Sequence, residues 1–310
     1  MKRKRYFFRY LRLFFSLTYV ITWTILLTEV ASQLGWVSIQ LPSAVFILAG
    51  FGPALAAAVL MAIWAGKRGI VALLRRLLIV RVGLGWYVVA ILLPPAIILS
   101  SLGTHRLMGG QVDLSLPPAL NFFKGQGEFT WLFILPVFIS QFFLLIGEEL
   151  GWRGYALPIL QTKYSALTSS LILGVLWGVW HLPMRWTPRT DAAVGKIPFG
   201  VFLLDIVLAA ILYTWLFNNT RGSVFLSTLF HAANNTAALF LPFIPEGGQD
   251  LNPLLIAVAI KFVLIILVVP FAGKKHLTKF FTAEERITLG EPEVSGAPSS
   301  EFYSDQEGVS

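Results

Sequence analysis

The sequence of 310 residues contains no cysteine and few charged residues. The missing cysteine excludes disulfides, thiolate metal ligands and a cysteine nucleophile. Charged residues make up 13% of the chain and hydrophobic residues 56%, which is too little polarity to cover a water-soluble domain of this size. The composition therefore predicts an integral membrane protein whose chemistry comes from Glu, Asp, His, Ser and similar side chains.

The chain also lacks a Gly-rich phosphate loop, an internal repeat of fixed period and an HExxH helix. The missing repeat leaves a duplicated transporter architecture unsupported. The net charge of +8 comes from short basic clusters beside apolar runs, such as residues 2–5 and 75–76. Such clusters orient membrane proteins, so we expect a bilayer and no nucleic acid as the partner.

Apolar windows long enough to cross a bilayer predict the fold class. We expect an all-α polytopic membrane protein with about eight transmembrane helices in one bundle. The first window is too long for a cleaved signal peptide, so it predicts an uncleaved helix. The windows are 13–34, 43–65, 84–104, 130–160, 166–184, 199–218, 223–244 and 252–272. Residues 69–83 are too short and basic to span, and we expect them at the membrane interface.

The distribution of lysine and arginine predicts that both termini are cytoplasmic. The connection carrying Arg185, Arg189 and Lys196 would then lie outside and fits this orientation least well. We expect residues 1–272 to form the transmembrane domain with an intramembrane site. Residues 273–310 are polar beyond Lys279 and are predicted to be a disordered cytoplasmic tail. The basic segments placed inside are the N-terminus, 67–81, 153–163, Arg221 and 274–275.

Ionisable side chains at membrane depth are costly, so each one is a candidate for function. In the fourth window, Glu149 and Arg153 are four residues apart and should pair on one helix face. Glu148 projects about 100° away and can face a cavity instead. Two adjacent carboxylates in different environments suit acid–base chemistry. The alternative is a charge cluster at a helix end, against which the apolar flanks argue.

The later windows contribute two histidines and an asparagine. His181 follows Trp177 by one turn, and Asn235 follows His231 by one turn, so each pair shares a helix face. Histidine and asparagine N–H groups can stabilise a developing oxyanion. The alternatives are a histidine in an aromatic belt for His181 and interhelical hydrogen bonding for Asn235.

These groups can form one site only if they meet at one depth. At 1.5 Å per residue, His181 lies roughly 22–24 Å from a helix start near residue 165. Glu148 reaches a comparable depth, roughly 18 Å, only if its helix continues through Trp152 to about Leu160. We therefore predict one long helix there. Asp205 and Lys261 are predicted to form a structural ion pair, with a proton pathway as the alternative.

At these positions the sequence resembles the CPBP family of intramembrane proteases, which groups CAAX prenyl endopeptidases with bacteriocin-processing and immunity (Abi) proteins. The resemblance covers roughly residues 129–235. The family's Glu-Glu-x-x-x-Arg element is Glu148, Glu149 and Arg153 here. Its Phe-x-x-x-His element appears as Trp177-Gly-Val-Trp-His181, and its His-x-x-x-Asn element as His231-Ala-Ala-Asn-Asn235.

The resemblance implies an eight-helix fold and an endopeptidase in which Glu148 and His181 activate a water. His231 and Asn235 would hold the oxyanion, while Glu149 and Arg153 support the geometry. A zinc site from Glu148, His181 and His231 is chemically reasonable, although we favour water activated by glutamate. No cofactor is required by the pattern.

The expected substrate is a peptide or protein associated with the membrane, and it can be lipid-modified. The resemblance also implies a bacterial cell membrane, which argues against prenylated CAAX substrates. Two other classes stay open: a polytopic transporter that uses the same polar groups, and a non-catalytic immunity or scaffold protein. Solute flux that needs Glu148 would indicate the transporter. A phenotype that survives substitution of Glu148 would indicate the immunity or scaffold protein.

Overall fold

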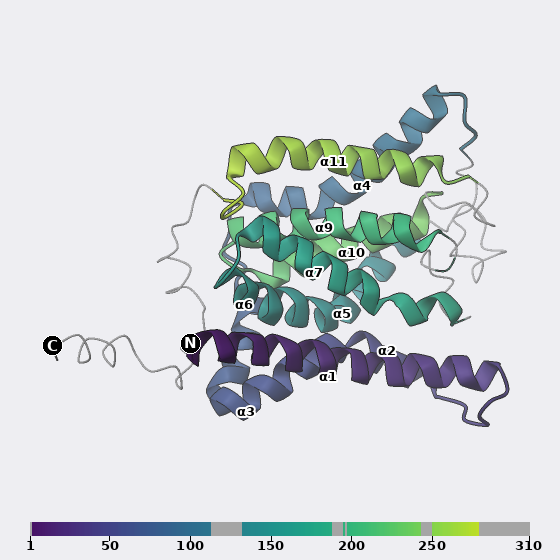
Figure 1. Cartoon of the computed structure of the whole chain (residues 1–310). Helices are drawn as coiled ribbons and strands as arrows, with labels where there is room; N and C mark the ends of the chain where they lie inside the picture. Colours follow the sequence, from purple (N-terminus) through teal and green to yellow (C-terminus); the bar gives the residue numbers. More distant parts are fainter. Residues whose placement is uncertain (1, 113–131, 188–194, 196, 243–249, 279–310) are drawn as a thin grey trace.

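The computed structural model describes residues 2–112, 132–187, 195, 197–242 and 250–278, and every regular element in them is helical. Figure 1 shows the helices packed side by side in one bundle. The long helices are α1 (Lys2–Gln33), α3 (Gly52–Arg75), α4 (Leu84–Leu107), α5 (Ile134–Gly151), α7 (Ala166–Trp180), α9 (Phe199–Asn219), α10 (Val224–Phe240) and α11 (Asn252–Ala272). Shorter elements are α2 (Ser43–Gly50), η1 (Arg76–Leu78), α6 (Leu157–Gln161) and η5 (Leu182–Trp186).

The predicted fold class, an all-α polytopic membrane protein, is confirmed. Within the described residues, seven helical stretches are long and apolar enough to cross a membrane. The eighth predicted window, 223–244, contains α10, a helix of 17 residues. Most of its side chains are buried, because it packs against α4, α5 and α9 in the middle of the bundle. A helix surrounded by other helices does not need a full hydrocarbon-spanning length.

The segment expected at the interface, 69–83, is not a separate helix. Residues up to Arg75 continue α3, which is kinked at Gly66, where φ is +56° and ψ is −149°. Glycine tolerates this left-handed backbone because it has no Cβ. The kink redirects the basic end of α3, and η1 and a short turn then lead into α4.

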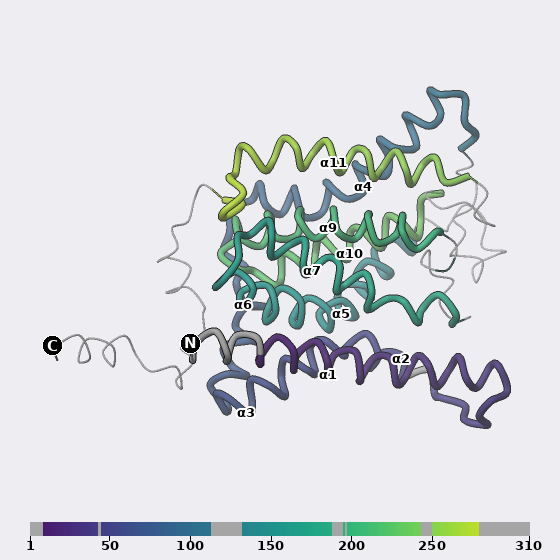
Figure 2. The backbone as a smooth tube through the Cα atoms, in the orientation of Figure 1, coloured from purple at the N-terminus to yellow at the C-terminus, as the bar shows by residue number. Residues whose placement is uncertain are grey.

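The predicted long helix in the fourth window is confirmed. Helix α5 passes through a π-helical turn, η4 (Trp152–Ala156), directly into α6, so the chain is helical from Ile134 to Gln161. Figure 2 shows this stretch as one continuous coil. It places Glu148 about 20 Å from either end, at the middle of the bundle.

The basic segments that were assigned to one side of the membrane do gather at one end of the bundle. The hydroxyl of Ser223 donates to the carbonyl of Ile79 at 2.6 Å, and the amide of Ala166 donates to the carbonyl of Lys275 at 2.9 Å. The start of α1 and the end of α11 lie at this same end (Figure 1). The chain stays packed against the bundle through Thr278, beyond the predicted boundary at 272. The rest of the predicted tail lies outside the described residues.

The predicted ion pair between α9 and α11 is present. The ammonium of Lys261 donates to both carboxylate oxygens of Asp205, at 2.7 and 2.8 Å, and Lys261 is buried. Pairing removes most of the cost of placing either charge at membrane depth. The pair therefore fastens α11 to the bundle.

Close packing of α3 on α5 generates a stability prediction. A Cβ at Gly151 would lie 2.3 Å from the Cβ and 2.5 Å from the carbonyl carbon of Pro53. Gly151→Ala should therefore destabilise the protein by about 1–3 kcal/mol, because backbone must move to accommodate the methyl group. Thermal unfolding in detergent measures this. Gly103→Ala, in a helical site with nothing within 4 Å, is the control, and equal stability of the two variants would contradict the packing argument.

Candidate active site

A buried ion cluster joins α5, η4 and α10. The Nη1 atom of Arg153 donates to Oε1 of Glu149 at 2.8 Å, and Nδ1 of His231 lies 2.9 Å from the same oxygen. Glu149 and Arg153 are both completely buried. Because a lone buried charge costs several kcal/mol, each member of this cluster depends on the others. The predicted pairing of Glu149 with Arg153 is thus present, and His231 joins it.

Two aromatic rings enclose the guanidinium of Arg153. Its Cζ lies 4.3 Å from the centre of the Trp177 ring and 4.0 Å from the centre of the Tyr213 ring. Among the residues that the structure describes, the Nε and Nη2 atoms of Arg153 have no hydrogen-bond partner. Cation–π contacts of this kind are worth about 2 kcal/mol or more when desolvated, so the rings replace part of the missing hydration.

Glu148 faces a different environment from Glu149. The indole Nε1 of Trp177 donates to Oε2 of Glu148 at 2.7 Å, which joins α7 to α5. The CPBP family, which this sequence resembles, has Phe at the position of Trp177. A Phe ring has no N–H to make this bond. The bond fixes one carboxylate oxygen of Glu148 and leaves Oε1 available to another group.

The remaining histidine, His181, ends α7. Its Nδ1 lies 2.8 Å from the carbonyl oxygen of Trp177. A carbonyl can only accept, so Nδ1 carries the proton and Nε2 points away as an acceptor in the neutral ring. The edges of Trp180 and Phe202 pack on the imidazole at centroid distances of 4.8 and 5.3 Å. Glu148 and His231 are its electrostatic neighbours.

Asn235, the last predicted site residue, lies one turn beyond His231 and is partly exposed. Its Nδ2 donates to Oε1 of Gln141, on α5, at 3.5 Å. The neighbouring Asn234 donates to Oδ1 of Asn235 at 3.3 Å. The structure therefore gathers all six predicted residues along the facing surfaces of α5, α7 and α10, with Asn235 at the edge of the group.

Exposure separates the cluster into two sides. Glu148 is 8% exposed, His181 9% and His231 5%. Glu149 and Arg153 are 0% exposed. The first three side chains therefore reach the surface of the bundle to a small extent, whereas Glu149 and Arg153 do not.

The zinc site that the resemblance allows would need Glu148, His181 and His231 to approach one ion. Within the described residues, no three His, Asp or Glu side chains are grouped so that they could hold a metal ion. Glu148 Oε2 is bound by Trp177, and Nδ1 of His231 is directed to Glu149. The candidate ligands Glu148, His181 and His231 thus do not form a ligand set in this arrangement.

Two residues of the site were missed from the sequence. Gln141 precedes Glu148 by seven residues, two helical turns on the same face, and its uncharged amide kept it out of a search for ionisable groups. Tyr213 stacks on Arg153 and meets His231 edge-on at 5.5 Å. No spacing rule links α9 to α5, so the sequence offered no signal for Tyr213.

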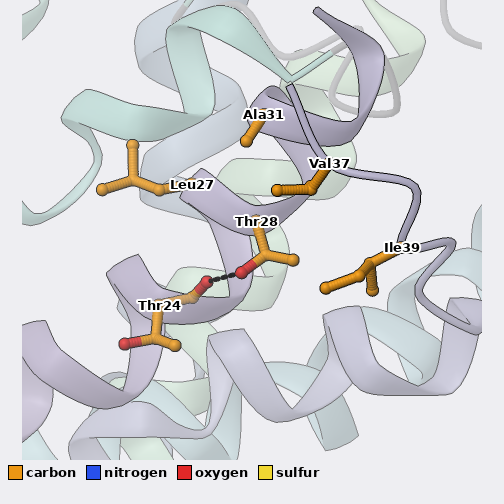
Figure 3. Close-up of a pocket in the computed structure, with 6 residues that line it drawn as sticks. All are labelled: Thr24, Leu27, Thr28, Ala31, Val37 and Ile39. Atoms are coloured by element: carbon orange, nitrogen blue, oxygen red, sulfur yellow. Dashed lines mark hydrogen bonds between the residues drawn. The ribbon is translucent and has the colours of Figure 1, made fainter. Parts of the chain in front are cut away.

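Two surface cavities of the described residues lie away from this site. One is lined by α1 and the chain after it, at Thr24, Leu27, Thr28, Ala31, Val37 and Ile39 (Figure 3). The other lies between the end of α4 and the start of α11, where His105 approaches Asp250 at 3.2 Å. Neither cavity includes a residue of the carboxylate and histidine cluster.

The fold and the site together define a polytopic membrane protein with a buried carboxylate–histidine centre, and comparisons with known proteins place it more closely. Residues 129–237 match the model of the type II CAAX prenyl endopeptidase Rce1-like family. Over 147 residues, 46% of this chain, the sequence is 33% identical to CAAX prenyl protease 2 of Methanococcus maripaludis, covering 52% of that protein.

A second kind of relative is Lysostaphin resistance protein A. The protein of Staphylococcus haemolyticus is 24% identical over a match that covers 44% of this chain and 36% of that protein. The protein of Staphylococcus epidermidis is 25% identical over a match that covers 44% of this chain and 35% of that protein. The matches thus span about half of the Methanococcus relative and about a third of the staphylococcal ones. They support the resemblance to the CPBP family that the motifs indicate over residues 129–235.

The buried cluster generates a second stability prediction. Arg153→Met should destabilise the protein by about 3–5 kcal/mol, because it leaves Glu149 buried without its countercharge. The double variant Glu149→Gln with Arg153→Met should recover much of this loss. Unfolding of the single and double variants measures the coupling. If the double variant loses as much free energy of unfolding as the two single variants lose together, the two charges are not coupled, and the 2.8 Å contact predicts that they are.

Proposed function

We propose that the protein is an intramembrane endopeptidase that hydrolyses a peptide bond with a water activated by Glu148 and His181. The observation that carries this proposal is the division between the two adjacent glutamates. Glu149 is completely buried and held by Arg153, whereas Glu148 is 8% exposed and its Oε1 has no hydrogen bond within the described residues. A general base needs this second environment, because it must contact the water that it deprotonates.

In the proposed reaction, Glu148 and His181 act on the water, and His231 and Asn235 act on the substrate oxygen. Oε1 of Glu148 accepts a proton from the water, Nε2 of His181 accepts a hydrogen bond from it, and the hydroxide attacks the carbonyl carbon of the substrate. The tetrahedral oxyanion is held by Nε2–H of His231 and the amide of Asn235. As the C–N bond breaks, protonated Glu148 returns the proton to the leaving nitrogen. This gives a carboxylic acid and an amine, restores the Glu148 carboxylate, and needs no other reactant.

The supporting residues have matching roles in this scheme. For His231 to donate from Nε2 while Nδ1 donates to Glu149, both of its nitrogens must be protonated. The Glu149 carboxylate contacts both that form of His231 and the guanidinium of Arg153, and the Glu148 carboxylate supplies the second negative charge of the site. Arg153 in turn balances Glu149. We therefore assign Glu149 and Arg153 as positioning residues and Glu148, His181, His231 and Asn235 as catalytic residues.

The proposed substrate is a membrane-associated peptide or protein. The Methanococcus relative is named for prenylated CAAX substrates, and a lipid-modified peptide would reach a site at membrane depth from within the bilayer. A quenched fluorescent peptide ending in a prenylated CAAX sequence is therefore the first probe. Its unprenylated twin tests whether the lipid is needed.

Removing the proposed base should abolish cleavage. In reconstituted vesicles, Glu148→Gln keeps the size of the side chain but cannot take a proton, so we expect cleavage to fall by about 10²–10⁴-fold. Expression and thermal unfolding should stay close to those of the unchanged protein. Full cleavage by the variant would reject the assignment, and solute flux that depends on Glu148 would favour the transporter.

The indole bond to Glu148 generates a separate prediction. Trp177→Phe keeps the aromatic ring over Arg153 but removes the N–H donor, so kcat should fall about tenfold with KM unchanged, because Glu148 loses its fixed orientation. Trp180→Phe is the matched control: this neighbouring tryptophan is equally buried and its Nε1 has no hydrogen-bond partner. Equal loss of kcat in both variants would show that general packing, and not the bond, is responsible.

A further inference from the structure

Three carboxamide side chains line one edge of the candidate active site. Gln141 comes from α5, and Asn234 and Asn235 from α10. All three are partly exposed. They are linked by two long hydrogen bonds, of 3.5 Å between Asn235 and Gln141 and 3.3 Å between Asn234 and Asn235. We call this group the carboxamide ladder.

The carboxamide ladder keeps unused hydrogen-bonding groups at membrane depth. In the described structure, the side-chain NH2 of Gln141 donates no bond and the side-chain oxygen of Asn234 accepts none. An unmade polar bond facing hydrocarbon costs several kcal/mol. The ladder therefore needs water or another polar partner to fill both a donor and an acceptor position.

The position of the carboxamide ladder relates it to the catalytic groups. Asn235 is one turn, about 6 Å, from His231, and Gln141 is two turns, about 10 Å, from Glu148 on the same face. Exposure increases in this direction along both helices, whereas Arg153 at the opposite side is fully buried. The ladder thus lies on the side from which a substrate can approach.

We infer that the carboxamide ladder binds the main chain of an extended peptide beside the bond that is cleaved. The ligand should be neutral, because the ladder offers amide donors and acceptors without a net charge. Peptide amides present the same two groups in alternation. An extended chain advances about 3.3–3.6 Å per residue, so about 10 Å accommodates three residues. This inference rests on the proposed function, but peptide binding can be measured without cleavage.

Main-chain binding at the carboxamide ladder tolerates different side chains, so a capped apolar hexapeptide of mixed sequence is a suitable probe. The full-length protein carries Glu148→Gln, so that no peptide is consumed, and is placed in lipid nanodiscs. Binding is titrated against empty nanodiscs, which account for partition into lipid. Gln141→Met and Asn234→Leu remove ladder groups with little change in volume. Gln33→Met, at an exposed position on α1, is the matched control.

The expected result is saturable binding that Gln141→Met and Asn234→Leu each weaken about tenfold and that Gln33→Met leaves unchanged. A hexapeptide with esters in place of amides lacks N–H donors for the free oxygen of Asn234, so it should bind less tightly to the intact ladder, and this difference should shrink in Asn234→Leu. Asn235 is left unchanged because it belongs to the proposed oxyanion site.

Two results would overturn the inference. One is the absence of saturable binding above empty nanodiscs. The other is unchanged peptide affinity in both variants, even with lowered thermal stability, which would show that Gln141 and Asn234 only join helices. Neither result tests the role of Glu148, which is decided by the cleavage assay. Conversely, cleavage by the Glu148→Gln variant would reject Glu148 as the base but would leave the peptide-binding result standing.

Discussion

A single buried oxygen, Oε1 of Glu149, determines how the central helices meet. It contacts both Arg153 and His231, so the carboxylate fixes α10 against α5. The aromatic faces of Trp177 and Tyr213 then bring α7 and α9 to the guanidinium. Since removing one member strands a charge in a dry interior, the cluster permits few alternative packings. The depth of the site in the bundle follows from this constraint.

The same cluster separates two chemically identical side chains. Successive residues on a helix point about 100° apart, so anchoring Glu149 on one side leaves Glu148 directed to another. There the indole of Trp177 binds one of its oxygens. Trp177 therefore contacts both halves of the site, because its ring covers Arg153 while its N–H orients Glu148. Two glutamates that are adjacent in sequence thus occupy different environments.

Much of this arrangement could be predicted from the sequence, because polar residues in apolar runs are few and their spacing of four fixes a shared face. The pairing of Glu149 with Arg153 and the long helix through Trp152 follow from such local rules. The contacts across helices do not. Neither the stacking of Tyr213 on Arg153 nor the hydrogen bond from Asn235 to Gln141 has a sequence signature, because both depend on how separate helices pack. The short length of α10 was missed for a related reason, since hydropathy does not show that other helices surround it.

The hydrolysis that we propose requires water at the reacting bond, and it requires that water be excluded from the charges of Glu149 and Arg153. The exposure gradient meets both needs, because Glu149 and Arg153 are sealed while Glu148 and His181 are slightly open. Contacts in a dry interior are stronger than the same contacts in water, so the sealed pair can hold His231 in a fixed orientation. Gln141 lies on the more exposed side, where its amide can meet a polar partner from outside the bundle.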